Sequence, residues 1–208
     1  MGAVWVIVVA AGEGRRFGGA KQYAPLAGRR VLDWSLDAAR SVADGVVIVV
    51  PPERRGDDEP LADAVATGAA TRSGSVRAGL ALVPAGAEVI VVHDGARPLA
   101  GPALFAAVVE AVRAGADAAL PGLPVSDSLR DRAGGPVDRE GLVAVQTPQA
   151  FRGPSLRAAH AGDPEATDDA SLVEAAGGKV VVVDGSPENI KITARADLAV
   201  AEALLGAR

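Results

Sequence analysis

The feature that most constrains this chain is an alternation of short Val- and Ile-rich runs with longer Ala- and Leu-rich stretches. The short runs lack the regular polar positions of a strand with one wet face, so they predict strands buried on both sides. Helical stretches between strands act as crossovers, which favour parallel pairing. We therefore expect an α/β fold with a mostly parallel sheet and helices on both faces. The predicted strands are Val4–Ala10, Gly45–Val50, Glu88–His93, Asp117–Leu120, Leu142–Gln146 and Lys179–Val183.

The clearest helix is expected over Pro102–Ala114, where apolar residues recur at helical spacing. A proline begins this segment and Gly115 follows it, as is common at the two ends of a helix. A last helix is expected from about Arg195 to Leu205. Residues 54–60 mix acidic and basic side chains with Gly and Pro and predict an exposed loop.

One stretch, about residues 124–143, interrupts the alternation. Two short extended runs flank the sequence Ala133-Gly134-Gly135-Pro136, a pattern that predicts a β-hairpin arm leaving the main sheet. Such an arm packs on its own domain or reaches a partner subunit. The 208 residues suit one sizeable α/β domain, and no long linker is visible. We expect a single domain over residues 1–208 that carries this arm.

Charge and cysteine content exclude several classes of function. The net charge of -5 argues against a nucleic-acid polymer as partner, because such proteins usually present a strongly basic face. The chain has no cysteine, which removes disulfides, thiolate metal sites and cysteine nucleophiles. The apolar start, Met1 to Ala11, has no preceding basic region and is too short to span a membrane, so it predicts a strand rather than a signal peptide. We expect a cytoplasmic protein that does not bind membranes.

Small and basic residues fill the segment that leaves the first strand, residues 10–23. Ligands of open α/β sheets bind at the carboxyl ends of strands, where this segment lies. Its glycines let backbone N–H groups approach phosphate oxygens, while Arg16 and Lys21 add positive charge. A tight turn with solvated basic residues is the alternative interpretation. Position and charge together favour a phosphate-binding loop.

Two common nucleotide-binding motifs do not fit this loop. A dinucleotide fingerprint needs G-x-G-x-x-G, but Phe17 occupies the third position after Gly14, and Gly18 comes one residue late. The phosphate loop of NTPases contains Gly-Lys-Ser or Gly-Lys-Thr, and neither occurs in the sequence. The loop is therefore expected to hold phosphates in another way.

Two further segments place charged residues near strand ends. Asp94 follows a strongly apolar run, and a carboxylate beside a phosphate loop suits Mg²⁺, which combines one or two carboxylates with phosphate oxygens. A helix cap or an ion pair with Arg97 is the other interpretation of Asp94, and His93 is assigned no role. Lys191 lies between two isoleucines, so its side chain faces away from them. It is either solvated or directed into a pocket.

These segments, in this order, resemble the 2-C-methyl-D-erythritol 4-phosphate cytidylyltransferase family of non-mevalonate isoprenoid biosynthesis. The resemblance covers nearly the whole chain. Each motif is weak alone, but their joint occurrence is specific. The matching motifs are Ala10-Ala11-Gly12, Lys21-Gln22-Tyr23, Arg72 with Ser75-Val76-Arg77-Ala78-Gly79-Leu80, His93-Asp94-Gly95-Ala96-Arg97-Pro98, Gln146-Thr147-Pro148-Gln149, Thr167-Asp168-Asp169-Ala170-Ser171 and Asn189-Ile190-Lys191.

The resemblance implies a Rossmann-like nucleotidyltransferase that transfers CMP from CTP to methylerythritol phosphate and releases pyrophosphate. It also implies Mg²⁺ or another divalent cation as cofactor, and a homodimer. The catalytic residues it implies are Arg16, Lys21 and Lys191, with Asp94 as metal ligand. The matching nucleotide contacts are Ala10, Ala11, Gly12, Gly14 and Ser75, and the matching substrate contacts are Arg97, Ser128, Arg139, Thr147 and Thr167.

The sequence departs from the family pattern in three places. Ala69 stands where the second glycine of a Gly-Gly pair is usual, which puts a methyl group near the expected base pocket, and Ser128 stands where threonine is common. The arm between Ser128 and Arg139 is also shorter than is common. Three other functions stay open: a cytidylyltransferase acting on ribitol 5-phosphate, a regulatory protein that senses CTP without turning it over, and a structural scaffold.

Overall fold

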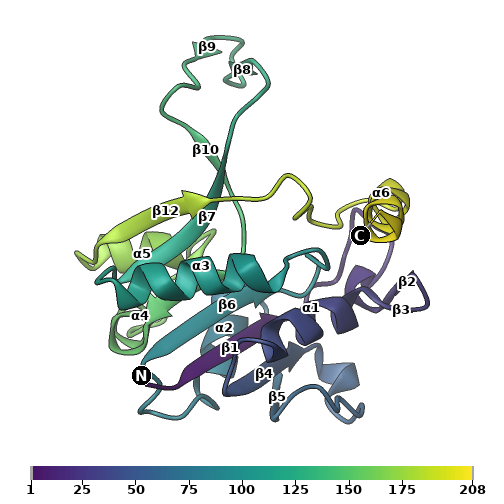
Figure 1. Cartoon of the computed structure of the whole chain (residues 1–208), viewed down its shortest axis with the longest axis vertical. Coiled ribbons are helices and arrows are strands. Elements are labelled where there is room, and N and C mark those ends of the chain that lie inside the picture. Colours follow the sequence, from purple (N-terminus) through teal and green to yellow (C-terminus); the bar gives the residue numbers. More distant parts are fainter. Residues whose placement is uncertain (1, 208) are drawn as a thin grey trace.

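An eight-stranded sheet runs through the centre of the molecule (Figure 1). The computed structural model describes residues 2–207. The strand order is β10-β7-β11-β6-β1-β4-β5, and β12 also pairs with β7. The strands are β1 (Val4–Val9), β4 (Gly45–Val50), β5 (Ala64–Thr67), β6 (Val89–Asp94), β7 (Ala118–Pro124), β10 (Val143–Val145), β11 (Gln149–Arg152) and β12 (Val180–Asp184).

Most neighbouring strands in this sheet are parallel. β1 pairs in parallel with β4 and β6, β4 with β5, and β7 with β12. The exceptions are β10, which is antiparallel to β7, and β11, which is antiparallel to both β6 and β7. The predicted fold class is therefore confirmed. The short strands β5 and β11 were not predicted.

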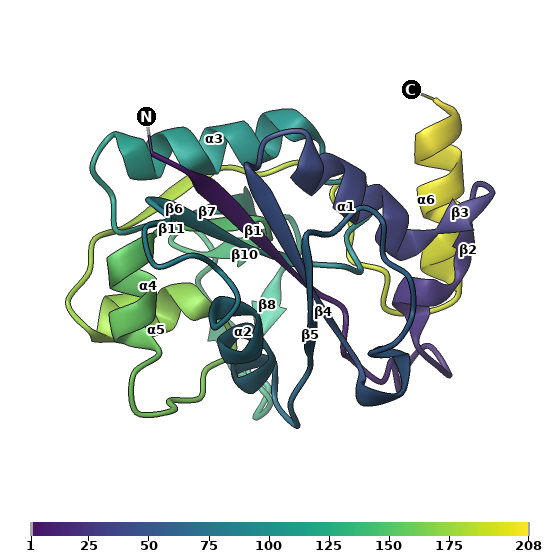
Figure 2. The same ribbon diagram turned by 90° about the horizontal axis from the view of Figure 1, so that it is seen from below.

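Helices cover both faces of the sheet (Figure 2). On one face lie α1 (Val31–Arg40) and α3 (Pro102–Arg113). On the other lie α2 (Arg72–Leu80), α4 (Gly153–Ala159) and α5 (Asp169–Ala175). The last helix, α6 (Ala196–Gly206), lies beside the small hairpin of β2 (Pro25–Leu26) and β3 (Arg29–Arg30). Two short 3₁₀ helices, η1 (Lys21–Tyr23) and η2 (Pro52–Arg54), follow the first two long strands.

The strands supply apolar side chains to both helical layers. Along β1, Val6 and Val8 pack toward α1 and α3, whereas Ile7 packs toward α2. All six residues of β4 are buried. This two-sided burial is the reason that the strands read as continuous apolar runs in the sequence.

The arm is present and projects away from the sheet (Figure 1). It leaves at the end of β7 and returns at the start of β10, and its tip is the antiparallel pair β8 (Leu129–Arg130) and β9 (Pro136–Val137). Gly134, in the turn, has a φ of 92°, a conformation that glycine adopts without strain.

Other expectations are confirmed or corrected at the level of single residues. Every predicted strand is found; β4 has the predicted ends and the other strands have ends that differ by a few residues, and the helix expected from Pro102 ends at Arg113. The prediction of an exposed loop over residues 54–60 is wrong at Glu59, which is 5% exposed. Arg30 donates hydrogen bonds of 2.9 and 2.8 Å to the two oxygens of that carboxylate, and this pairing allows Glu59 to be buried. Among residues 2–207, no helix has both the length and the apolar character needed to cross a membrane.

Candidate active site

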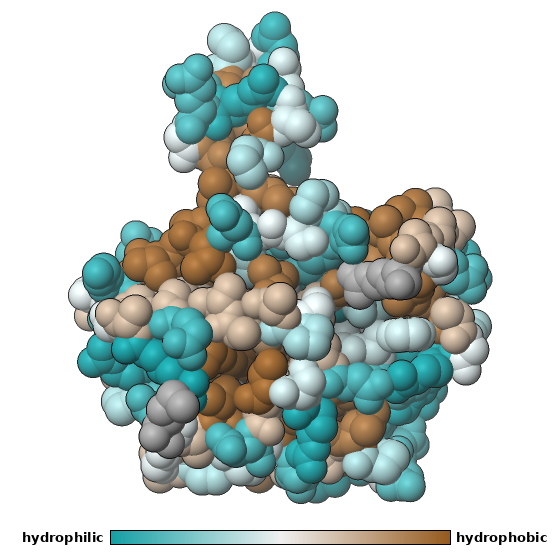
Figure 3. All heavy atoms as spheres, viewed as in Figure 1, coloured by the Kyte–Doolittle hydropathy of each residue, from teal (hydrophilic) through white to brown (hydrophobic). Residues whose placement is uncertain are grey.

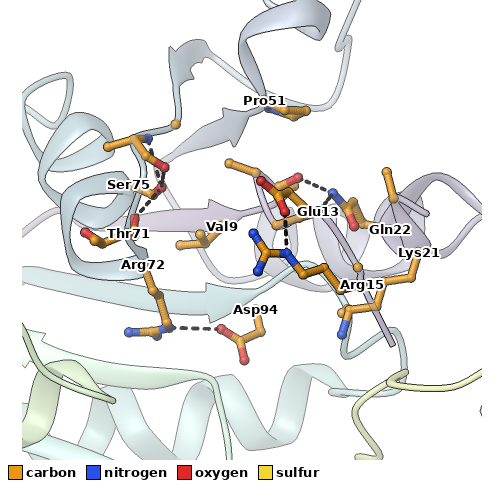
Figure 4. Close-up of a pocket in the computed structure, with 18 of the residues that line it drawn as sticks. Val9, Glu13, Arg15, Lys21, Gln22, Pro51, Thr71, Arg72, Ser75 and Asp94 are labelled. Atoms are coloured by element: carbon orange, nitrogen blue, oxygen red, sulfur yellow. Dashed lines mark hydrogen bonds and ion pairs between the residues drawn. The ribbon is translucent and has the colours of Figure 1, made fainter. Parts of the chain in front are cut away.

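A pocket of about 860 Å³ lies at the carboxyl edge of the central strands (Figure 4). The loop after β1 and the segment between β5 and α2 supply much of its lining, and Asp94 of β6 and Lys191 complete it. This is the edge where open α/β sheets bind their ligands. The lining includes these residues predicted from the sequence: Ala10, Ala11, Gly12, Gly14, Lys21, Ser75, Asp94 and Lys191.

The glycine-rich loop after β1 is held in shape by its own contacts. Gly14 has a φ of 64°, and a Cβ there would lie 1.8 Å from the carbonyl oxygen of Gly19. The side chain of Gln22 is buried and donates from Nε2 to the carbonyls of Ala10 at 2.5 Å and Gly12 at 3.0 Å. These bonds fix the loop before any ligand binds, which lowers the entropy cost of binding a phosphate group.

The segment between β5 and α2 approaches the loop closely. A Cβ on Gly68 would lie 2.2 Å from the Cβ of Ala11, so only glycine fits at this position. Ala69 lines the pocket, and its Cβ also lies near Gly74, since a Cβ built on Gly74 would be 2.9 Å from it. Ser75 accepts a hydrogen bond from the Ala69 N–H at 3.1 Å. Of the usual Gly-Gly pair, the first glycine is the one that this geometry requires.

Basic side chains from two distant parts of the chain meet at the pocket. Lys21 and Lys191 both line it. Burial lowers the pKa of Lys21, and the nearby charges of Lys191 and Arg16 lower it further. Arg16 is not among the described residues that line the pocket; its neighbour Arg15 is, and Arg15 pairs with Glu13 at 2.8 Å. The cationic character predicted for this site is present, and a catalytic role of Arg16 stays a prediction.

Asp94 is the centre of this charge arrangement. Its side chain is 12% exposed, with Lys191 Nζ at 2.5 Å from Oδ2 and Arg72 Nε at 3.4 Å from Oδ1. Burial alone would raise the pKa of Asp94, but Lys191 and Arg72 outweigh that effect and hold the pKa below its usual value. Its backbone N–H donates to Thr147 Oγ1 at 3.0 Å. Asp94 is thus an ionised carboxylate at a fixed position in a cationic pocket.

The residues around Asp94 fit a metal ion of one particular kind. Within residues 2–207, no group of three or more His, Cys, Asp or Glu side chains could hold a metal by itself. Asp94 is the one buried carboxylate in the described lining of the pocket, which matches Mg²⁺, because this ion takes few protein ligands and completes its shell with phosphate oxygens and water. The donor set therefore suits a metal that is shared with a bound phosphate ligand.

Comparison with known proteins agrees with this geometry. The sequence model of the IspD family, 2-C-methyl-D-erythritol 4-phosphate cytidylyltransferase, matches residues 4–207. The chain belongs to this family. Family membership confirms the resemblance drawn from the motifs and identifies the chain as a cytidylyltransferase, an enzyme of the nucleotidyltransferase class.

Individual relatives cover nearly all of this IspD-family chain. A 2-C-methyl-D-erythritol 4-phosphate cytidylyltransferase of Cereibacter sphaeroides strain KD131 is 44% identical over 96% of the chain and 95% of its own length. A bifunctional IspD/IspF enzyme of Ruegeria pomeroyi is 45% identical over 96% of the chain, which spans only 56% of that longer protein. The crystal structure of the Thermus thermophilus cytidylyltransferase superimposes with a TM-score of 0.83 at 39% identity and covers 98% of both chains.

Arg72 is a site residue to which the sequence analysis gave no role. It lines the pocket and pairs with Asp94 and, at 2.7 Å, with Asp169. Burial lowers the pKa of Arg72, but the two carboxylates outweigh burial and raise it. One signal in the sequence could have found it: Arg72 begins a helix capped by Thr71, and a cation is disfavoured at that end of a helix.

Thr147 and Arg97, both matched to substrate contacts, lie beside the pocket rather than in its described lining. Thr147 is buried. Its Oγ1 accepts a hydrogen bond from the backbone N–H of Asp94 and lies 3.2 Å from His93 Nδ1. Arg97 donates to the Asn189 carbonyl at 2.7 Å. His93 itself is fully buried, and burial lowers its pKa to about 4. Thr147 and His93 therefore support Asp94 from behind, and a substrate contact by Thr147 or Arg97 stays a prediction.

The other three predicted substrate residues are exposed and do not line the described pocket. Ser128 and Arg139 lie on the arm, where Arg139 donates to the Ser126 carbonyl. Thr167 lies in the loop just before α5, whose N-cap is Asp168. The nucleotide side of the predicted site is therefore assembled within one chain, whereas the substrate side is spread over its edge and the arm.

Proposed function

We propose that this chain transfers CMP from CTP to 2-C-methyl-D-erythritol 4-phosphate with the help of a divalent metal, as a homodimer. The observation that carries the proposal is the pocket at the sheet edge, where a glycine loop, two lysines and an arginine surround the buried carboxylate of Asp94. Such a pocket suits a triphosphate and a second phosphate better than any neutral ligand. A cytoplasmic location fits a reaction that consumes CTP.

The reaction needs charge stabilisation more than proton transfer. A phosphate oxygen of the sugar alcohol attacks the α-phosphorus of CTP, a new P–O bond forms, and the bond to the β-phosphate breaks to release pyrophosphate. That phosphate is already ionised at neutral pH, so it needs no general base. The pocket chemistry agrees with this requirement: His93 is buried away from the pocket and neutral at pH 7, because burial lowers its pKa to about 4.

Lys21, Lys191 and Arg16 are proposed to stabilise the negative charge that builds up as the two anions meet. Lys21 and Lys191 line the pocket directly. Fixed cations act most strongly in a site that excludes water, where they need no reorganisation during the reaction. Lys191 Nζ lies 2.5 Å from Asp94 Oδ2, so this lysine is proposed to stabilise phosphate charge from a position beside the metal ligand.

Asp94 is proposed to hold the divalent cation, together with phosphate oxygens of CTP. The metal, when bound, neutralises triphosphate charge and polarises the phosphoryl group. The chain's own contribution is to keep the Asp94 carboxylate ionised and aligned, through the backbone bond to Thr147 and the low pKa that Lys191 and Arg72 maintain.

Nucleotide recognition is proposed to rest on the loop after β1 and on the start of α2. The residues are Ala10, Ala11, Gly12, Gly14 and Ser75, all of which line the pocket. Ala69 also lines the pocket, so its methyl group is proposed to narrow the space for the base.

The sugar-alcohol phosphate is proposed to contact Arg97, Thr147 and Thr167 of one chain and Ser128 and Arg139 on the arm of a second chain. An exposed apolar surface supports the homodimer (Figure 3). Val143 of β10 and Val182 of β12 both lie against Gly122 and are 43% and 54% exposed. Large apolar side chains clustered at the foot of a polar arm are typical of a surface that another subunit covers.

A pyrophosphate-release assay tests the proposed function. Purified protein with Mg²⁺ and CTP should release pyrophosphate only when methylerythritol phosphate is added, and the other three nucleotides should support much less turnover. Ribitol 5-phosphate is the matched competitor. Equal or better turnover of ribitol 5-phosphate would contradict the substrate while keeping the cytidylyltransferase class.

A further inference from the structure

Arg72 is held at the pocket from two sides. Its Nε donates to Asp94 Oδ1 at 3.4 Å, and its Nη1 donates to Asp169 Oδ2 at 2.7 Å. Figure 4 shows Arg72 and Lys21 on opposite sides of Asp94. Because Arg72 begins α2, the helix dipole disfavours its charge, and acidic partners are needed to keep it there. The guanidinium is therefore a further cation in the pocket, and Asp169 holds it independently of the lysines.

Asp169 reaches Arg72 from behind the pocket. It is the first residue of α5 and has a fully buried side chain that is not part of the described pocket lining. His160, the C-cap of α4, lies with Nε2 at 3.0 Å from Asp169 Oδ1. A carboxylate only accepts hydrogen bonds, so His160 Nε2 is the donor. Each oxygen of Asp169 has one fixed donor, and the carboxylate cannot rotate without losing one of them.

Two hydrogen bonds beside the ion pair hold the loop before α5 against the start of α2. Thr71 donates from Oγ1 to Glu165 at 2.9 Å, and the N–H of Ala166 donates to Ser73 Oγ at 3.2 Å. Both bonds join the residues next to Arg72 to the loop that leads into α5. Asp169 and Arg72 are therefore placed by contacts on either side of their own ion pair.

Stability alone is a poor reason for this arrangement. A buried ion pair is often no more stabilising than well-packed apolar residues of the same volume, because both charges must lose their water. Here a buried His–Asp pair supports a single arginine whose charge faces the pocket. The arrangement is better suited to fixing a cation than to filling a core.

We propose that Asp169 and His160 are positioning residues that hold the Arg72 guanidinium beside Asp94, where it meets phosphate charge during the reaction. This inference rests on the proposed function. Neither Asp169 nor His160 touches the ligand; both act through Arg72. A guanidinium displaced by about 1 Å loses much of its effect on a transition state, and such displacements can lower rates by about 100-fold.

A double-mutant cycle tests whether Asp169 acts through Arg72. Asp169→Asn keeps the shape but weakens the ion pair, and Arg72→Lys keeps the charge but cannot bridge two carboxylates. We expect each single variant to lower kcat by about 10- to 100-fold, with the KM for CTP changing by less than about threefold. The double variant should be no slower than Arg72→Lys alone. Losses that multiply would overturn the proposal, because they would mean two independent effects.

His160 provides a graded version of the same test. Gln places an amide N–H near the position of Nε2, so His160→Gln should retain most of the wild-type kcat, whereas His160→Ala should lose about 10-fold. Equal losses in both variants would contradict a role for the hydrogen bond to Asp169. If Asp169→Asn does not fold, the cycle of His160→Ala with Arg72→Lys answers the same question.

Asp168→Ala is the matched control for damage to α5. It removes the N-cap hydrogen bond to the Ser171 N–H, one residue away from Asp169, and should lower the melting temperature without lowering kcat. A kcat loss in this control as large as that in Asp169→Asn would mean that the helix, rather than Arg72, explains the effect.

A spectroscopic measurement separates this inference from the proposed function. The Nε–H resonance of Arg72, assigned by its loss in Arg72→Lys, should be sharp in the ligand-free protein and broadened in Asp169→Asn and His160→Ala. An unchanged resonance in both variants would overturn the positioning role even if the enzyme is fully active. A wild type without turnover but with the expected resonances would contradict the function and leave the positioning role intact.

Discussion

The pocket edge and the arm are built in opposite ways. At the pocket, buried polar side chains hold one another: Gln22 fixes the glycine loop, and Asp94 is fixed by Lys191, Arg72 and Thr147. The arm consists of exposed residues around a pair of two-residue strands, and side-chain bonds such as that of Arg139 to Ser126 join arm residues to each other. One region is organised within a single chain, whereas the other presents exposed polar groups on a projecting arm. The proposed shared active site accounts for both.

The largest effect is expected from the most tightly held group of the pocket. Asp94→Asn should lower turnover by about 1000-fold, because an amide is a far weaker Mg²⁺ ligand than a carboxylate and the transition state loses several kcal/mol of charge stabilisation. Pyrophosphate release over a Mg²⁺ titration measures the loss, and thermal unfolding checks that the fold is retained. Asp184→Asn, at the exposed end of β12, is the matched control and should stay active. Near-normal activity of Asp94→Asn at low Mg²⁺ would make Asp94 an ion-pair residue only.

A smaller loss is expected from the cations around that carboxylate. Lys21→Ala and Arg16→Ala should lower kcat much more than they raise the KM for CTP, because both charges act mainly on the transition state. Lys21 lines the pocket and Arg16 does not, so about 100-fold is expected for Lys21→Ala and less for Arg16→Ala. Steady-state kinetics with both substrates separates the two constants. Lys179→Ala, on the surface, is the control, and a pure KM effect of Lys21→Ala would reassign it to triphosphate binding.

Mixing two inactive variants tests directly whether the arm of one chain completes the pocket of another. In the proposed dimer, Lys21→Ala damages the pocket of its own chain, and Arg139→Ala damages the arm that this chain is proposed to lend to a partner. Random re-association of equal amounts should restore about a quarter of the wild-type sites, because half of the dimers are mixed and one of their two pockets is intact. Arg132→Ala, which removes another basic residue of the arm, should be active by itself. No recovery despite confirmed subunit exchange would mean that each pocket is built from a single chain.

The smallest effect concerns stability and leaves activity at pH 7 unchanged. Burial lowers the pKa of His93 from 6.5 to about 4, so the unfolded chain binds a proton more readily than the folded one. The free energy of unfolding should therefore fall as the pH drops from about 6.5 toward 4, by about 2 kcal/mol at pH 5 from this residue. Denaturant unfolding at pH 7 and pH 5 measures the change. His93→Gln should show a weaker pH dependence, and an equal dependence would place the effect elsewhere.

The fold was largely predictable because the long strands are buried on both faces. Gly45–Val50 is apolar throughout and was predicted with the observed ends. β11 escaped prediction because its four residues, Gln149–Arg152, begin and end with polar side chains and carry no apolar repeat. Glu59 was placed on the surface because its partner Arg30 is 29 residues away in the chain, and a long-range ion pair leaves no local pattern.

The candidate site was predictable to the extent that its residues lie in the matching motifs. Lys21, Asp94 and Lys191 were named from the sequence and line one pocket. Arg72 received no role, because its meaning depends on Asp169, and the two are 97 positions apart. The hydrogen bond from the Asp94 N–H to Thr147 Oγ1 could not be predicted either, because it depends on how β11 enters the sheet.

The position of β11 has a consequence for how the nascent chain acquires its structure. β6 and β7 are separated by one helix in the sequence, yet they do not pair; β11, made later, bonds to both. At synthesis rates of about 5–20 residues per second, several seconds pass between the emergence of β6 and of β11. Through that interval β6 can pair with β1 on one side, but the side that faces β11 in the finished sheet has no partner strand. Fragments that end before Gln149 should therefore exchange the amide proton of Val92, which faces β11, rapidly, and fragments that include β11 should protect it. The growing polypeptide therefore passes through a stage in which an apolar strand edge is unpaired, and such edges favour aggregation.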